Sequence, residues 1–168
     1  HPTIYVRGSA ATLGESEGTG ADPYMGLTIG STKPRMAWTG DVRRFYFEPP
    51  LVRLLSDGDP DERYEDVYAD GDDLVAADRD DPVPYRCIVI FRYYDDTSED
   101  FGDGKRKPIA YFAEKLGKLI LRLREKVCAN PLNNVTRKDF RVHLVAHSLG
   151  GVICRPFLLN AALRTHPP

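Results

Sequence analysis

The feature that most constrains the fold is a pair of apolar strands separated by one long amphipathic helix. Residues 86–94 (RCIVIFRYY) have a continuous apolar centre, which is typical of a strand in a sheet covered on both faces. Apolar residues then recur at helical spacing over residues 109–128. Residues 140–146 (FRVHLVA) form the next apolar strand. A strand, a helix and a strand in this order indicate a crossover between parallel strands, so the sequence predicts an α/β fold.

Further elements precede and follow this unit. Residues 3–8 (TIYVRG) read as a short strand that ends at a glycine, and residues 151–163 as a helix disturbed at Pro156. Residues 9–81 form a long excursion, and such a segment inside a compact domain is usually functional or mobile. Its aromatic and apolar side chains suit either a lid or inserted wall over a site, or ordinary core. We treat residues 1–168 as a single domain.

Composition limits the classes of partner. The chain is 42% hydrophobic and 29% charged with a net charge of −2, so nothing suggests a nucleic-acid partner. No apolar run approaches the roughly 20 residues of a transmembrane helix. No signal peptide opens the given sequence, and the compartment stays open. Three cysteines, all in apolar segments, are expected to be buried free thiols: Cys87, Cys128 and Cys154.

The stretch LVAHSLGG, residues 144–151, places a serine where the last strand ends and a helix begins. A turn tight enough to expose Ser148 strains the backbone and leaves no room for bulky side chains two positions away. Ala146 and Gly150 meet that requirement, and Gly151 is expected to let the helix pack closely. The same turn aims the amide of Leu149 at the space above the serine oxygen, where an oxyanion would develop.

The segment Ala146-His147-Ser148-Leu149-Gly150 resembles the nucleophile elbow of the α/β-hydrolase superfamily, especially its lipase and esterase branch. The resemblance implies a mostly parallel sheet with flanking helices and Ser148 as the nucleophile. It also implies an oxyanion hole built from the Leu149 amide and an amide in the loop after the first strand. The candidates in that loop are Arg7, Gly8 and Ser9. Two positions depart from the family pattern: Ala146 replaces a glycine, and Arg7 replaces the histidine of a His-Gly pair.

The same resemblance requires a base and an acid, in the chain order serine, acid, histidine. After Ser148 the sequence contains no Asp or Glu, and its one histidine is His166. His147 is too close to the serine in sequence to serve as the base, and His143 is expected to be an interior histidine. We therefore expect the acid and the base beyond Pro168, which makes this chain the N-terminal portion of an incomplete hydrolase fold.

Acidic residues before the serine do not supply these groups. Asp95 and Asp96 follow a strand at its carboxyl end, but solvation of a loop explains them. The segment DGDPDE, residues 57–62, is similar to the start of an EF-hand loop and then departs from it, since Glu62 stands where glycine is required and Tyr68 where the bidentate Glu is required. The sequence predicts no metal and no cofactor.

The resemblance implies a serine hydrolase that acts on carboxylic esters, lipids foremost, through an acyl-enzyme on Ser148. The expected partners are a small-molecule ester or lipid and a transient lipid surface. Three alternatives on the same scaffold stay open at this point, namely an acyltransferase, a thioesterase or an amidase. A fourth is a non-catalytic α/β binding domain in which Ser148 is idle.

Overall fold

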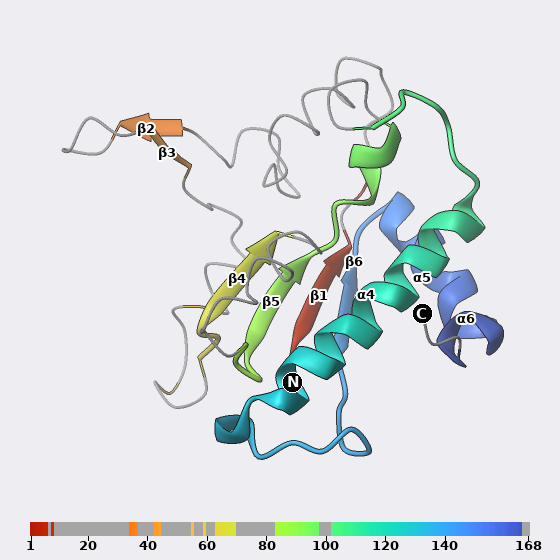
Figure 1. The fold of residues 1–168 in the computed structure, drawn as a ribbon. Helices are drawn as coiled ribbons and strands as arrows, with labels where there is room; N and C mark the ends of the chain where they lie inside the picture. The colour runs from red at the N-terminus through yellow and green to blue at the C-terminus, as the bar shows by residue number, and fades with distance from the viewer. Residues whose placement is uncertain are drawn as a thin grey trace.

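The computed structural model describes residues 1–6, 8, 34–36, 42–44, 55, 59, 63–69, 83–97 and 102–165. Within this part of the chain, four strands form one sheet in the order β4-β5-β1-β6. The strands are β1 (Thr3–Val6), β4 (Asp66–Ala69), β5 (Cys87–Ile90) and β6 (His143–Ala146). Every neighbouring pair is parallel, so all four arrowheads point the same way in Figure 1. The chain therefore has the predicted α/β arrangement.

The register of the central strand decides what meets at the carboxyl edge of the sheet. In β1, Thr3 pairs with His143 of β6 and Val6 pairs with Ala146. The residues that follow these two strands, Gly8 and Ser148, must therefore emerge side by side. Ligand sites of open parallel sheets lie at this carboxyl edge.

The helices follow the expected order. Helix α4 (Ile109–Ala129) connects β5 to β6 and crosses over β1, and α5 (Leu149–Leu159) follows β6 directly. The described residues also form three short helices: η2 (Tyr93–Thr97), η3 (Pro131–Asn133) and α6 (Ala162–Thr165). A separate two-stranded antiparallel hairpin pairs β2 (Pro34–Met36) with β3 (Val42–Arg44).

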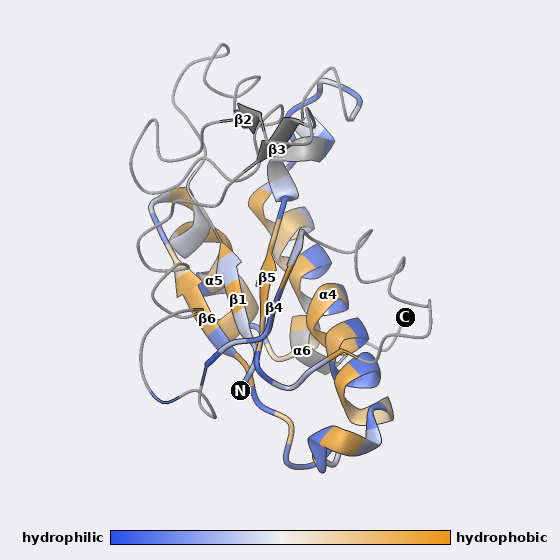
Figure 2. Cartoon of the chain, turned by 90° about the vertical axis from the view of Figure 1, so that its left-hand side faces the viewer, coloured by the Kyte–Doolittle hydropathy of each residue, from blue (hydrophilic) through white to orange (hydrophobic). Residues whose placement is uncertain are grey.

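One face of the sheet carries the larger core. Apolar side chains of β1 and β5 pack there with α4 and α5, which also contact each other. Figure 2 shows the apolar stripe of α4 and the mainly apolar β5. The core residues contributed by the two helices are Phe112, Ala113, Leu116, Leu119, Leu123, Val127, Ile153, Cys154 and Phe157. The 3.6-residue periodicity of residues 109–128 predicted the buried stripe of α4.

The opposite face is smaller. Tyr5, Ile88 and Ile90 are buried there and pack with Leu55, Tyr64 and Val67. Alternation along β1 sends Ile4 to the helical face and Tyr5 to the other, as expected for adjacent residues of a strand. Because both faces of β5 are buried, its continuous apolar run is explained.

The end of α4 is anchored to the chain that enters β5. Asn130 caps the helix, accepts a hydrogen bond from the Leu132 amide and donates one to the Val83 carbonyl. Asn133 donates to the same carbonyl at 2.9 Å and accepts from the Tyr85 amide. These hydrogen bonds join the segment before β5 to the end of α4, the helix that follows β5 along the chain. Helix α4 ends at Ala129, one residue beyond the range of 109–128 predicted from its apolar spacing.

Several details differ from the sequence-based expectations. The strand expected over residues 86–94 ends at Ile90, and Tyr93 already belongs to η2. Strand β4 was not predicted, because it is short, begins with Asp66 and is flanked by acidic segments. A helix disturbed at Pro156 was expected over residues 151–163, whereas α5 begins at Leu149, runs through Pro156 and ends at Leu159. Apart from the residues named above, the excursion over residues 9–81 lies outside the described part of the chain, so a lid there is still only a prediction.

Candidate active site

Ser148 has an unusual backbone conformation. Its φ is 53° and its ψ is −122°, and among the described residues Asn134 is the other non-glycine with positive φ. Asn134 lies in the ordinary left-handed helical region, which asparagine tolerates well. Ser148 lies instead near the mirror image of the β region, which glycine adopts readily and other residues reach at a cost of about 1–3 kcal/mol. The strain predicted for an elbow is therefore present at this serine.

The hydroxyl of Ser148 is not used as a helix cap. Ser148 occupies the N-cap position of α5, where a serine side chain commonly accepts a hydrogen bond from an amide of the first turn. Here the side chain makes no capping hydrogen bond, and the residue is exposed. Ser148 therefore does not serve as a helix cap, which is the simplest structural role for a serine at this junction.

Gly8 lies directly against the serine. A Cβ atom built on Gly8 would lie 2.8 Å from the Cβ of Ser148, 3.0 Å from Nδ1 of His147 and 3.3 Å from the His147 carbonyl. Carbon atoms do not approach each other that closely, so no side chain fits without movement of the elbow. The close approach places the exit of β1 against the exit of β6, as the register requires. Of the oxyanion candidates in this loop, Gly8 is at the site, whereas Arg7 and Ser9 lie outside the described residues.

The other oxyanion candidate is the amide of Leu149. Leu149 is the first residue of α5, and first-turn amides have no acceptor within their own helix. The next amides are engaged, since Gly150 donates to the His147 carbonyl and Gly151 to the Ser148 carbonyl. The Leu149 amide thus lies at the positive end of the helix dipole, beside the exposed serine. Such a position suits a negatively charged ligand atom.

The small residues of the elbow divide into two groups. Gly150 is buried, in agreement with the expected lack of space two residues after the serine. Gly151 is exposed, and a Cβ there would meet no atom within 4 Å. The prediction that Gly151 allows close packing of the helix is therefore wrong. Ala146 is exposed on the edge strand β6, where its methyl group is tolerated.

A close helical contact that the sequence did not reveal lies elsewhere, at Gly117. A Cβ there would lie 2.5 Å from the carbonyl oxygen of Leu163, so α4 and α6 meet backbone to backbone. Glycine within an otherwise regular amphipathic pattern was the available signal.

The described histidines do not provide a base for Ser148. His143 begins β6, at the opposite end of the strand, and is roughly 15 Å of extended chain from the serine. It is exposed, with its ring 5.4 Å from that of His1, so its expected interior position is wrong. His147 is adjacent to the serine, and its ring is directed toward Gly8. His166 lies outside the described residues.

Asp96 is committed to a different interaction. Its carboxylate accepts hydrogen bonds from Lys115 at 2.7 Å and from the Tyr111 hydroxyl at 3.0 Å. These contacts fasten η2, which follows β5, to the first turns of α4. Asp96 therefore does more than solvate a loop, and its carboxylate oxygen is already occupied. The side chain of Asp95 lies outside the described residues.

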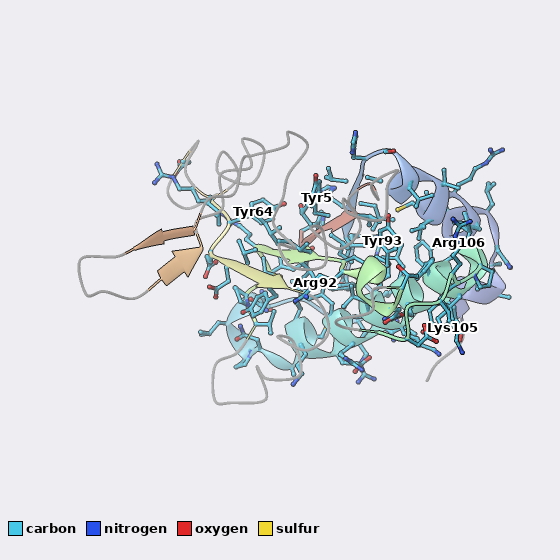
Figure 3. The ribbon with its side chains drawn as sticks, turned by 90° about the horizontal axis from the view of Figure 1, so that it is seen from above. Tyr5, Tyr64, Arg92, Tyr93, Lys105 and Arg106 are labelled. Atoms are coloured by element: carbon cyan, nitrogen blue, oxygen red, sulfur yellow. The ribbon has the colours of Figure 1, made fainter. Side chains whose placement is uncertain are left out.

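Exposed apolar side chains lie on the strand and the helix that flank the elbow. Val145 on β6 is 41% exposed, and Val152 on α5 is 51% exposed, one helical turn beyond Ser148. Lys105 and Arg106 are exposed on the loop before α4 (Figure 3). The two elements that the elbow joins thus expose apolar side chains, which favours an uncharged ligand group at their surface.

The cysteines do not offer a second nucleophile at this site. All three are free, as predicted, and Cys87 and Cys154 are buried whereas Cys128 is only partly so. Burial raises the pKa of the Cys87 thiol to about 12 and that of Cys154 to about 11. Both thiols are therefore protonated at neutral pH and unreactive.

Metal and membrane features can be stated for the described residues alone. They contain no group of three or more His, Cys, Asp or Glu placed to hold a metal ion. None of their helices combines the length and apolar character needed to cross a bilayer.

Comparison with known proteins identifies no relative. No protein-family model matches the chain, and no curated protein or solved structure has significant similarity to it. The geometry of the elbow is therefore what indicates a function for this chain.

Proposed function

We propose that this chain carries the nucleophile of a serine hydrolase of the α/β-hydrolase type, which acts on carboxylic esters, lipids among them. The observation that carries the proposal is the strained, uncapped Ser148 at the exit of a parallel strand. Strain of this kind persists where the surrounding structure enforces it, and it is concentrated at functional sites. A serine that merely ended a strand would relax or cap its helix.

In the proposed reaction, Oγ of Ser148 attacks the ester carbonyl and its proton passes to a base. The carbonyl oxygen becomes an oxyanion, which the amides of Leu149 and Gly8 would stabilise from two sides. Collapse of the tetrahedral intermediate releases the alcohol and leaves an acyl-enzyme, which water then hydrolyses to the acid. The base and its orienting acid are not among the described residues.

An ester with an apolar acyl group fits the surroundings better than a charged one. Val145 on β6 and Val152 on α5 expose apolar surface on the two elements that the elbow joins, and apolar groups gain about 25 cal/mol per Å² of surface removed from water. The exposed valines also suit transient contact with a lipid surface.

A fluorophosphonate probe tests the proposal directly. It should react covalently with the full-length protein, and peptide mass spectrometry should locate the adduct on Ser148. The Ser148→Ala variant, with the same fold, should not be labelled. Absence of labelling in the folded wild-type protein would favour the binding-domain alternative.

Product analysis separates the catalytic alternatives. With p-nitrophenyl acetate, octanoate and palmitate, a lipid esterase should release free acid and prefer the longer chains. Transfer of the acyl group to an added alcohol in preference to water would identify an acyltransferase. Faster turnover of matched thioesters or amides would identify a thioesterase or an amidase.

A further inference from the structure

The side chain of His147 forms part of the contact that encloses Gly8. The positions nearest to a Cβ on Gly8 belong to two consecutive residues, the Cβ of Ser148 and the ring nitrogen Nδ1 and carbonyl of His147. The elbow therefore presents both the nucleophile and a wall against the neighbouring loop. Any residue at position 147 would place its carbonyl in this wall, because the turn fixes the backbone. The ring nitrogen is there only because residue 147 is a histidine.

The backbone of His147 is held on both sides. Its amide donates to the carbonyl of Val6 at 3.0 Å, which extends the pairing of β6 and β1 past the last strand residue. Its carbonyl accepts the 2.9 Å hydrogen bond from Gly150 in the first turn of α5. With the backbone fixed, the ring nitrogen occupies a defined place beside Gly8.

Gly8 itself has less support. The hydrogen bond from His147 holds the chain at Val6, and no backbone hydrogen bond joins the Gly8 amide to another described residue. Glycine is also the residue with the greatest backbone freedom. The described groups that border the Gly8 peptide are therefore His147 and Ser148, which leave no room for a Cβ on Gly8.

We propose that His147 is a positioning residue, whose imidazole holds the Gly8 peptide at the distance from Ser148 that oxyanion binding needs. This inference rests on the proposed function, because it assigns His147 a role in the same reaction. An oxyanion hole acts through donors that are already in place, and a misplacement of about 1 Å can cost about 100-fold in rate. His147 acts here by occupying space, without donating or accepting the proton of the serine.

Two substitutions separate this role from others. His147→Ala removes the ring, whereas His147→Asn keeps a polar atom close to the position of Nδ1 and cannot serve as a base at neutral pH. In the full-length protein, His147→Ala should lower kcat by about 10- to 100-fold with little change in KM. This decrease in kcat should not exceed the decrease caused by removal of an oxyanion-hole donor. His147→Asn should retain most of the wild-type kcat.

A stability cycle tests the contact without using activity. Gly8→Ala should destabilise the wild-type protein, because its methyl group meets both Ser148 and His147. In the His147→Ala background the same substitution should cost less, although the contact with Ser148 keeps it above zero. Thermal or denaturant unfolding of the four proteins gives the coupling.

The outcomes are distinct from failure of the proposed function. If Ser148→Ala keeps ester hydrolysis, the proposed function fails. If Ser148→Ala is inactive but His147→Ala has wild-type kcat, only the positioning role is wrong. Equal losses in His147→Ala and His147→Asn would overturn it too, because ring chemistry would then be needed. Additive stabilities in the cycle would show that the contact does not exist and would also overturn it.

Discussion

Two strands of the same parallel sheet, β5 and β6 on either side of β1, leave it in different ways. β5 passes through Phe91 and Arg92 into the turn η2, where the carboxylate of Asp96 is bound by Lys115 and Tyr111. β6 leaves through Ser148, whose backbone is strained and whose hydroxyl caps nothing. A polar group with partners in the fold is explained by stability. A polar group held in a strained position, with no such partner among the described residues, needs another explanation, and the proposed catalytic role supplies one.

The largest expected difference between the two exits is in activity. Ser148→Ala should lower ester hydrolysis by at least about 1,000-fold while the protein stays folded, because the nucleophilic oxygen is the group removed. Asp96→Asn is the matched control at the other exit and should keep kcat within about twofold. Initial rates with a p-nitrophenyl ester, together with circular dichroism, measure both. Similar losses in the two variants would remove the distinction between the exits.

The next effect concerns packing at the β6 exit. Gly150→Val should destabilise the protein by about 1–3 kcal/mol, because a branched side chain at this buried position overpacks the junction. Gly151→Val is the control, and it should change the stability by less than about 0.5 kcal/mol, since a Cβ there meets nothing. Denaturant unfolding compares them. Equal stability of the two variants would argue against a tight elbow.

Backbone strain should be measurable in the same way. Ser148→Gly should be more stable than Ser148→Ala by about 1 kcal/mol, because glycine tolerates a φ of 53° with a ψ of −122° and alanine does not. Both variants lack the hydroxyl, so the comparison isolates the conformation. If Ser148→Gly proved less stable than Ser148→Ala, the strain inferred at the β6 exit would be absent.

The smallest effect belongs to the β5 exit. Asp96→Asn should cost about 0.5 kcal/mol of stability, because a partly exposed ion pair contributes little and Tyr111 can still donate to the amide oxygen. High salt should reduce the difference from wild type, since it screens the pair. A loss of stability above about 2 kcal/mol would contradict this, because it would show that the Asp96 carboxylate contributes far more than a surface ion pair normally does.

The sequence determined the elements whose physics is local. The continuous apolar run of β5 and the helical periodicity of α4 follow from which residues stand at which spacing, and both were predicted from it. The end of α4 was predicted to within one residue for the same reason. Ser148 was found because a tight strand-helix turn demands small neighbours, and Ala146 and Gly150 are visible in the chain. These signals need no knowledge of distant contacts.

Only the tertiary structure decided which distant residues meet. The register of β1 with β6 brings Gly8 against Ser148, and no local pattern could have specified that contact or the place of the His147 ring. The binding of Asp96 to Lys115 and the close approach at Gly117 likewise depend on how helices settle on the sheet. Gly151 shows the reverse case, since a glycine that looked necessary for packing faces open space. Pairing and packing join residues far apart in sequence, so the sequence alone indicates the proposed nucleophile, whereas the fold decides which residues lie beside it.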